Sequence, residues 1–469
     1  MLKIPENETK VTFDGIFLKC LSFNSVEQRD EVMQVVKGGA VSNLLKAVPI
    51  PKMFHAKQEF PKDRIEPEDI PPLIYRELSK PGFGSKIRPG MQIAITAGSR
   101  GIRNVDIITK AVVDFVKSKG AVPFIVPAMG SHGGADAQGQ KDMLAGFGIT
   151  EETMGCGIRS SMEVVKLGIS DTGRTVYMDK NAYGSDGIIV SCRIKPHNAF
   201  RGRVESGICK MMTVGLGKQK GAEEVHSDGM NRIAENIPSM AKVVLGKAPI
   251  LFAIPCMENA YDETCRIEAV APEEILTREP ELLKFAFSNM PSILVGSADV
   301  LVVDEIGKNY SGTGTDPNIT GTFSTPYATG GLQVQRTCFL RLSEVSHGNA
   351  LGVGLASCIT KAIFDRIDTG AMYPNCVTST VIRSAMIPVV VATEKEAVSL
   401  CIRTLNQADK NHVRMVRIPN SLHISQIMLS EAYYKKAANH EFRGLEALDR
   451  PASLTFDEQE RLATPYLTG

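Results

Sequence analysis

Tryptophan is absent from this 469-residue sequence, and aromatic residues make up only 6% of it. Charge of one sign is also lacking: 53 basic residues balance 52 acidic residues along the chain, for a formal net charge of +1. Nucleic-acid binders generally present a basic surface, and those that bind single strands add aromatic stacking platforms. We therefore expect no nucleic-acid partner.

Long apolar runs and paired cysteines are missing as well. No run approaches the roughly 18 apolar residues that a membrane-spanning helix needs, so we expect no membrane partner. The ten cysteines include no C-x-x-C pair, which argues against a disulfide framework and against a cysteine-based metal site. The first ten residues, MLKIPENETK, do not resemble a signal peptide, and the sequence ends without a lipidation motif. These features predict a cytoplasmic protein.

What the sequence does contain is a repeated alternation of short apolar runs, glycine-containing loops and segments with helical periodicity. This alternation is typical of parallel α/β layers. At roughly 100–200 residues per domain, the length predicts two large domains. We predict an α/β fold of two domains with mostly parallel sheets and an active site in the cleft between them. The expected boundaries are an N-terminal domain at 1–280 with the cofactor and catalytic histidines, a C-terminal domain at 281–440, and a tail at 441–469 that packs back on a domain surface.

The clearest βαβ unit is predicted from a strand at Ile93–Thr96, a helix capped by Asn104, and a strand at Val122–Pro127. Other elements follow from apolar runs of suitable length and period. The further strands are expected at Asp186–Ser191, Ile250–Ile254, Val300–Val303, Thr337–Leu342 and Pro388–Ala392, and further helices at Asn349–Phe364 and Glu394–Arg403.

Two histidines follow predicted strands, where ligands of open α/β sheets bind. His132 lies in the loop MGSHGG, and His197 lies in RIKPHNAF. Two bases that titrate near neutral pH suit proton transfer on the two sides of a substrate. Ordinary loop histidines are the alternative interpretation.

A lysine and a third histidine lie further along the chain. Lys210 is a single cation in an apolar stretch, which favours covalent or cofactor use over a solvated surface position. His226 follows sixteen residues later, about 24 Å away on a continuous helix, so the two can meet only if the chain turns. The glycines in Met211–Gly221 permit that turn, although their spacing matches neither common phosphate-binding motif. By residue chemistry alone, His226 could equally belong to a solvated helix.

Two further loops carry candidate binding groups. Ser99 and Arg100 stand between a strand and a helix start, where guanidinium and backbone amides favour an anion; a structural salt bridge is the alternative. Lys308 and the polar run Asn309–Asn318 suit a polyhydroxylated or carboxylated ligand, although such a run can also consist of turns.

Taken in order, these groups resemble the nickel-dependent lactate racemase family over approximately residues 85–230. The matching residues are Arg100 in AGSRG, His132 in GSHGG, His197 in KPHNAF, Lys210 in GICK and His226 in EEVH. The sixteen-residue step from Lys210 to His226 is the most specific match. The departures are Ala97 in place of an acidic residue, three extra residues between His197 and Lys210, and arginines at 201 and 203.

The resemblance implies a nickel-pincer nucleotide, the nickel complex of pyridinium-3-thioamide-5-thiocarboxylate mononucleotide, as cofactor. It would be linked covalently through Lys210 and contacted by Arg100 and Ser99, with His226 as the nickel ligand. His132 and His197 would be the acid/base pair of a racemase or epimerase that inverts C2 of a 2-hydroxy acid by hydride transfer.

The arginines at 201 and 203, with Lys308 and the polar run Asn309–Asn318, predict a substrate larger and more polar than lactate, such as a sugar acid or a dicarboxylic hydroxy acid. Its binding residues would be Lys308, Asn309 and Arg201. The expected partners are this small molecule and, transiently, the proteins that make the cofactor, while a homo-oligomer stays an open alternative. Two other functions also stay open, a nicotinamide-dependent oxidoreductase and a non-catalytic protein that binds sugar acids or nucleotides.

Overall fold

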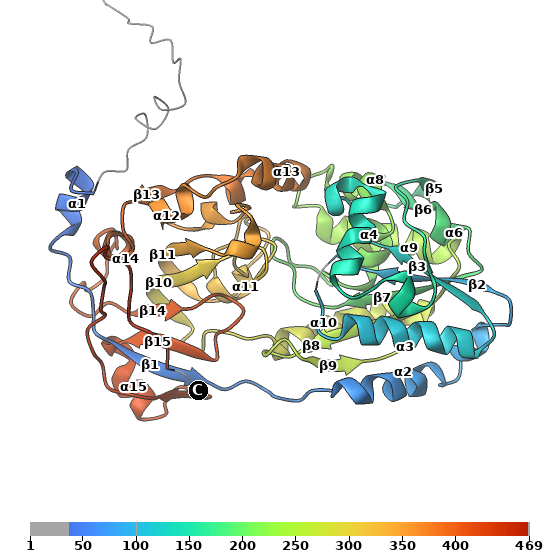
Figure 1. Ribbon diagram of the computed structural model, residues 1–469, viewed down its shortest axis with the longest axis horizontal. Coiled ribbons are helices and arrows are strands. Elements are labelled where there is room, and N and C mark those ends of the chain that lie inside the picture. The colour runs from blue at the N-terminus through green and yellow to red at the C-terminus, as the bar shows by residue number, and fades with distance from the viewer. Residues whose placement is uncertain (1–36, 100, 468–469) are drawn as a thin grey trace, which may run out of the picture.

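The computed structural model describes residues 37–99 and 101–467, which form two open β-sheets with helices on their faces (Figure 1). The α/β class with large, mostly parallel sheets, predicted from the sequence, is confirmed. Within the described residues, the structure contains no helix with the length and apolar character that crossing a membrane requires.

The first sheet has six strands in the order β4-β3-β2-β7-β8-β9. All neighbouring pairs are parallel except β8 and β9, which are antiparallel. The strands are β2 (Gln92–Ala97), β3 (Val122–Pro127), β4 (Gly157–Ile158), β7 (Gly187–Arg193), β8 (Ile250–Glu258) and β9 (Thr264–Ile267). The runs at Ile93–Thr96, Val122–Pro127, Asp186–Ser191 and Ile250–Ile254 are therefore strands of one sheet, as predicted.

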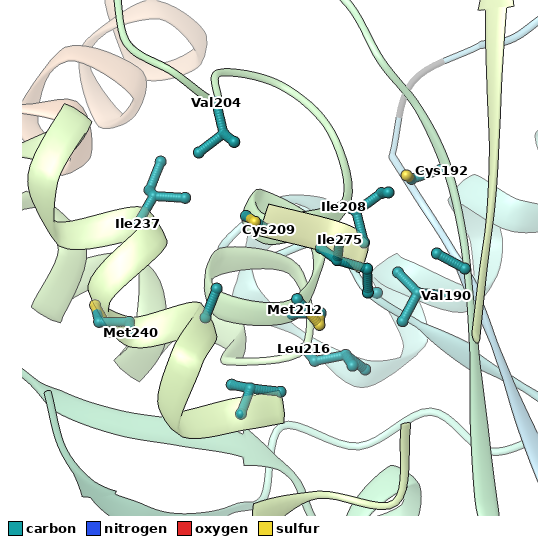
Figure 2. Close-up of a cluster of buried hydrophobic side chains, with 14 of the residues drawn as sticks. Val190, Cys192, Val204, Ile208, Cys209, Met212, Leu216, Ile237, Met240 and Ile275 are labelled. Atoms are coloured by element: carbon teal, nitrogen blue, oxygen red, sulfur yellow. The ribbon is translucent and has the colours of Figure 1, made fainter. Parts of the chain in front are cut away.

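Helices cover both faces of this sheet, which is why its central strands are apolar on both sides. Ile93 and Ile95 of β2 belong to a core with the helices α2 (Ile70–Leu78) and α3 (Val105–Ser118). Ala94 belongs to a second core with the helices α7 (Ile208–Lys210), α9 (Ile233–Lys247) and α10 (Ile275–Asn289). Figure 2 shows part of that second core around Ile208, Met212 and Ile275.

The second sheet has eight strands in the order β13-β12-β11-β10-β14-β15-β1-β16. The pairs from β13 to β14 are parallel, and those from β14 to β16 are antiparallel. The strands are β1 (Met53–Gln58), β10 (Ser297–Ile306), β11 (Gln333–Leu342), β12 (Cys358–Thr360), β13 (Val389–Val391), β14 (Met415–Ile418), β15 (Gln426–Ser430) and β16 (Leu445–Ala447).

Strand β1 departs from the predicted division of the chain, which assigned all of 1–280 to the first domain. It pairs with β15 and β16 of the second sheet instead. The reason is packing, since Phe54 and Ala56 are fully buried in the core of that sheet. Strand β16 comes from the predicted tail, and helix α10 spans residue 280.

Two local predictions were wrong. Asn349–Phe364 is not one helix: strand β12 and a short helix occupy its second half. Gly352 explains the break, because its φ of +113° is left-handed and a side chain there would overlap the Thr313 carbonyl oxygen. Helix α3 does begin after Asn104, but Asn104 has a φ of 61° and its side chain makes no capping hydrogen bond.

The remaining elements complete the fold. The short antiparallel strands β5 (Val164–Ile169) and β6 (Thr175–Asp179) form a separate hairpin. The helices are α1 (Ala40–Leu45), α2 (Ile70–Leu78), α3 (Val105–Ser118), α4 (Ala137–Gly146), α5 (Glu151–Met154), α6 (Lys180–Tyr183), α7 (Ile208–Lys210), α8 (Lys218–His226), α9 (Ile233–Lys247), α10 (Ile275–Asn289), α11 (Pro317–Thr320), α12 (Lys361–Phe364), α13 (Thr369–Ser379), α14 (Glu394–Arg403) and α15 (Tyr434–Ala438).

Candidate functional site

The candidate residues of the first sheet follow its strands at one edge. Strands β3, β2 and β7 are parallel neighbours, so the loops after them leave the sheet on the same side. Ser99 follows β2, His132 follows β3, and His197 follows β7. Arg100, the predicted cofactor contact, lies outside the described residues.

His132 is exposed, and a hydrogen bond orients its ring. Its Nδ1 lies 2.5 Å from the hydroxyl oxygen of Ser99. Ser99 thus fixes the Nδ1 side of the ring, and Nε2 is the nitrogen on the side away from Ser99. Ser99 was predicted from the sequence as a cofactor contact, and here it contacts a predicted acid/base residue.

His197 is half-buried, and its neighbours determine both its position and its tautomer. Its backbone N–H donates to Glu205 Oε2 over 2.6 Å, and its ring lies against Phe200 with the centroids 4.4 Å apart. The backbone N–H of Ala199 donates to His197 Nδ1 over 3.1 Å. A neutral His197 therefore carries its ring proton on Nε2.

The environment of His197 keeps the ring neutral. Burial lowers its pKa well below the ordinary value, because an imidazolium loses hydration there. Electrostatic contributions lower it further, and in decreasing order they come from Lys210, His226, Lys195 and Arg201. The structure thus brings His197, Lys210 and His226 within electrostatic reach of one another.

Lys210 and His226 come within electrostatic reach of each other because the chain turns between them, as the sequence required. Helix α7 ends at Lys210, a π-helical turn called η5 follows at Met211–Gly215, and α8 then leads to His226. Glycine is needed in this turn: a side chain at Gly217 would overlap the carbonyl oxygen of Thr213. Such π-helical turns occur frequently at functional sites.

The surroundings of His226 leave a ring nitrogen unsatisfied. Burial, with the charge of Lys210 adding to it, lowers the pKa of His226 to about 4. Its Nδ1 is buried and finds no hydrogen-bond partner in the described part of the chain. A buried polar atom without a partner is costly, and a neutral imidazole of this kind is a common metal ligand.

The turn η5 also packs against the loop of His132. The N–H of Gly130 donates to the carbonyl oxygen of Gly215 over 3.2 Å. A side chain at Gly215 would come within 2.8 Å of the carbonyl oxygen of Ala128. The segment with Lys210 and the segment with His132 are therefore in direct contact, at the edge of the sheet that the sequence predicted.

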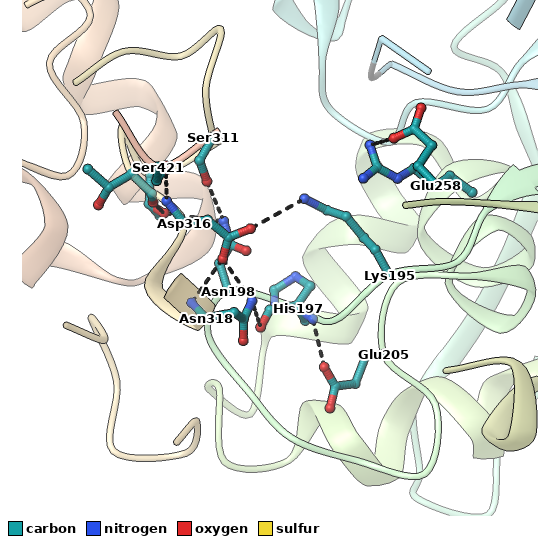
Figure 3. Close-up of polar contacts among 12 residues, drawn as sticks. Lys195, His197, Asn198, Glu205, Glu258, Ser311, Asp316, Asn318 and Ser421 are labelled. Carbon is teal, nitrogen blue, oxygen red and sulfur yellow. Dashed lines mark hydrogen bonds and ion pairs between the residues drawn. The ribbon is translucent and has the colours of Figure 1, made fainter. Parts of the chain in front are cut away.

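The loop of His197 lies against the polar segment that follows β10 of the second sheet (Figure 3). Asn198 Nδ2 donates to Ser311 Oγ over 2.9 Å and to Thr313 Oγ1 over 3.2 Å. Lys195 Nζ lies 4.0 Å from Asp316 Oδ2. The polar segment that the sequence singled out after β10 thus contacts the segment that carries an acid/base candidate.

Arg201, predicted to bind substrate, makes many contacts within the protein. Its Nη1 donates to the carbonyl oxygen of His197 over 2.7 Å and to Glu205 Oε2 over 3.2 Å, and its Nη2 donates to Asn318 Oδ1. Glu205 is 2% exposed, so this arginine balances a buried carboxylate. These contacts join the His197 loop to the second sheet, and a role in substrate binding stays a prediction.

Lys308 and Asn309 lie at the start of the same polar segment. Lys308 Nζ donates to the carbonyl oxygen of Gly312 over 2.8 Å, which folds the segment back on itself. Asn309 is exposed, and its Oδ1 accepts from Ser343 Oγ over 2.7 Å. Their predicted contacts with substrate stay predictions.

Sequence reasoning missed several residues that support this site. Glu205 and Glu279 are buried carboxylates beside the segments of His197 and Lys210, and nothing in the sequence marks them. Lys218 is fully buried, and its place between glycines in GLGKQKG was the available signal.

Protein side chains alone do not form a metal site in the described residues: no three His, Cys, Asp or Glu side chains come together suitably for one. A metal ion at His226 would need most of its donors from another molecule. A cofactor that brings its own donor atoms fits that requirement.

Three comparisons with known proteins bear on this chain. Residues 104–272 match the model of a family described as a domain of unknown function, DUF362, and this range includes His132, His197, Lys210 and His226. A search of curated proteins finds no match. Among solved structures, the chain is similar to the lactate racemase apoprotein from Thermoanaerobacterium thermosaccharolyticum, with 15% identity, a TM-score of 0.42, and coverage of 76% of this chain and 82% of that chain.

Proposed function

We propose that this protein is a racemase or epimerase that inverts C2 of a 2-hydroxy acid, using a nickel-pincer nucleotide attached to Lys210. The observation that supports this most is that Lys210, His226 and His197 lie within electrostatic reach of one another, and that a buried nitrogen of His226 has no described partner. The order and spacing of the motifs in the sequence support it independently.

The residues present fit this cofactor. The amine of Lys210 would hold it covalently, and one ring nitrogen of His226 would complete the coordination of the metal. One imidazole added to soft sulfur and carbon donors suits square-planar nickel, and this arrangement needs no cluster of protein ligands. The bound cofactor would supply reversible acceptance of a hydride from C2 of the substrate.

The two remaining histidines would move the hydroxyl proton. With Ser99 at its Nδ1, His132 takes the proton at Nε2. To return a proton to the carbonyl oxygen, His197 would first have to be protonated, which the negative charge of a bound substrate carboxylate would favour. The imidazolium would then donate from Nε2 and become a neutral ring. The reverse reaction exchanges the two roles, which is what inversion between two enantiomers or epimers requires.

Charge and polarity around His197 support an acidic, hydroxyl-rich substrate. Positive charges of Lys195 and Arg201 lie within electrostatic reach of the ring, and they favour a carboxylate. The segment 308–318 adds hydroxyl and amide groups next to Asn198. We therefore propose a substrate larger than lactate, such as a sugar acid.

The test is production of the protein together with the biosynthetic proteins of the cofactor, followed by intact mass, metal content and turnover. We expect a mass increase on the peptide that contains Lys210, stoichiometric nickel, and faster turnover of C4–C6 hydroxy acids than of lactate. The Lys210→Ala variant should lose the added mass, whereas Lys220→Ala, which changes an exposed lysine of α8, should keep it.

An unmodified, nickel-free protein under those conditions would contradict the proposal. Turnover that requires added nicotinamide nucleotide would support an oxidoreductase instead. Faster turnover of lactate than of every larger acid would retain the reaction but reject the proposed substrate class.

A further inference from the structure

A buried lysine lies beside the site and has no place in the proposed chemistry. Lys218 is 0% exposed, and its Nζ faces three oxygen acceptors. These are the carbonyl oxygen of Pro127 at the end of β3, Gln140 Oε1 of α4 at 3.1 Å, and Asp179 Oδ2 at the end of β6 at 3.3 Å. A buried ammonium is costly without such partners. The ends of β3 and β6 and the helix α4 are therefore held together by their contacts with Lys218 Nζ.

One series of hydrogen bonds connects Lys218 to the loop of His132. Gln140 is also 0% exposed, and its side chain is oriented by the hydrogen bond from Lys218 to its oxygen. Its Nε2 then donates to the carbonyl oxygens of Gly130 over 3.0 Å and His132 over 3.1 Å. Gln140 therefore joins Lys218 to the backbone of the loop that presents His132.

The helix α8 connects Lys218 to His226. Lys218 is the first residue of α8, and His226 is the last. Two helical turns, about 12 Å, separate them on a rigid element. Lys218 has a φ of 54°, a left-handed conformation that non-glycine residues adopt only when their surroundings demand it. The contacts of its ammonium group hold Lys218 in this conformation.

We infer that Lys218 is a positioning residue that, through Gln140, holds the loop of His132 in a fixed relation to the helix that carries His226. The roles of the two histidines rest on the proposed function, whereas the linkage itself rests on the contacts above. A displacement of about 1 Å between reacting groups can cost on the order of 100-fold in rate. A shared buried anchor limits such displacement, because the loop cannot move without breaking buried hydrogen bonds.

The test compares Gln140→Met, Lys218→Met and the control Lys220→Met by amide hydrogen exchange on the full-length chain purified without cofactor. Gln140→Met leaves Lys218 its other two acceptors and removes only the link to the loop. We expect the amides of residues 129–134 to exchange about 10-fold faster in this variant, while α8 keeps its protection. In Lys218→Met, residues 129–134 and 218–226 should both exchange faster.

Unchanged exchange at 129–134 in Gln140→Met would overturn the inference. An equal increase along the whole chain would also overturn it, because Lys218 would then be a general stabilising residue. If Lys218→Met does not fold, Gln140→Met alone decides the question.

In the cofactor-loaded enzyme, Gln140→Met should lower kcat by about 10- to 100-fold and change KM by less than about 3-fold. Unchanged kcat in a folded, loaded variant would overturn the positioning role. If the wild-type protein shows no racemase activity, the proposed function fails, whereas the exchange experiment still decides whether Lys218 holds the loop.

Discussion

Glu279 of α10 accepts a hydrogen bond from the backbone N–H of Cys209 over 2.9 Å, one residue before Lys210. The carboxyl group is 0% exposed and lies at the start of α7, where helix amides favour an acceptor. Glu279, which follows Lys210 by 69 positions in the sequence, thereby holds the segment that carries Lys210, the proposed cofactor anchor.

The burial of Glu279 predicts a pH dependence of stability, although the hydrogen bond from Cys209 opposes it. Burial raises the pKa of Glu279 from 4.5 to about 7. A carboxyl group whose pKa is higher in the folded state stabilises that state fully below pH 4.5 and loses this contribution as the pH rises through 7. Glu279→Gln has no such loss, so its stability relative to wild type should rise by about 3 kcal/mol between pH 4 and pH 8.

Urea unfolding at the two pH values measures this difference. The matched control is Glu281→Gln, which changes an exposed carboxylate on the same helix and should show no comparable slope. A constant difference between Glu279→Gln and wild type across this range would contradict the assignment.

Lys210→Met should raise the pKa of His197, because the positive charge of Lys210 is the largest contribution after burial. Burial remains in the variant, so the pKa should stay below 6.5. Histidine-selective NMR titration of the cofactor-free protein measures both statements. Lys220→Met is the control, and an unchanged His197 titration in Lys210→Met would show that the two groups are not near each other in solution.

His132→Gln and His197→Gln should each lower kcat by about 100- to 10,000-fold, the usual contribution of a general acid or base. Neither change touches Lys210 or His226, so added mass and nickel should remain.

In deuterium oxide, the wild-type product should keep its original hydrogen at C2, because the proposed reaction moves a hydride there and a proton only at the hydroxyl group. Incorporation of solvent deuterium at C2 would indicate carbanion chemistry instead.

Arg201→Met should destabilise the protein by about 3 kcal/mol, because the buried carboxylate of Glu205 loses its ion-pair partner and keeps only hydrogen bonds from backbone N–H groups. The measurement is urea unfolding, with Arg203→Met as the control at a neighbouring exposed arginine. If the variant keeps its stability and instead binds substrate about 10-fold more weakly, direct substrate binding by Arg201 is favoured.

Local patterns were sufficient for much of the fold. The strands β2, β3 and β7 and the helix α14 follow from apolar runs and periodicity, and the edge that carries His132 and His197 follows from the geometry of parallel sheets. The prediction failed at Asn349–Phe364, where Gly352 needs a left-handed conformation that an apolar pattern does not reveal. It also could not assign β1, because pairing with β15 involves residues more than 300 positions away.

The sequence by itself determined the chemistry that is available: the order of two histidines, a lysine in an apolar stretch and a third histidine, with glycines that permit a turn. Only the tertiary structure decided which of these groups meet and in what state. Burial lowers the pKa of His197 and His226. Glu205 and Glu279 hold the segments of His197 and Lys210, and Lys218 is connected to the loop of His132 through Gln140. The physical reason is that desolvation and hydrogen-bond partners depend on residues far away in the sequence, which no local pattern contains.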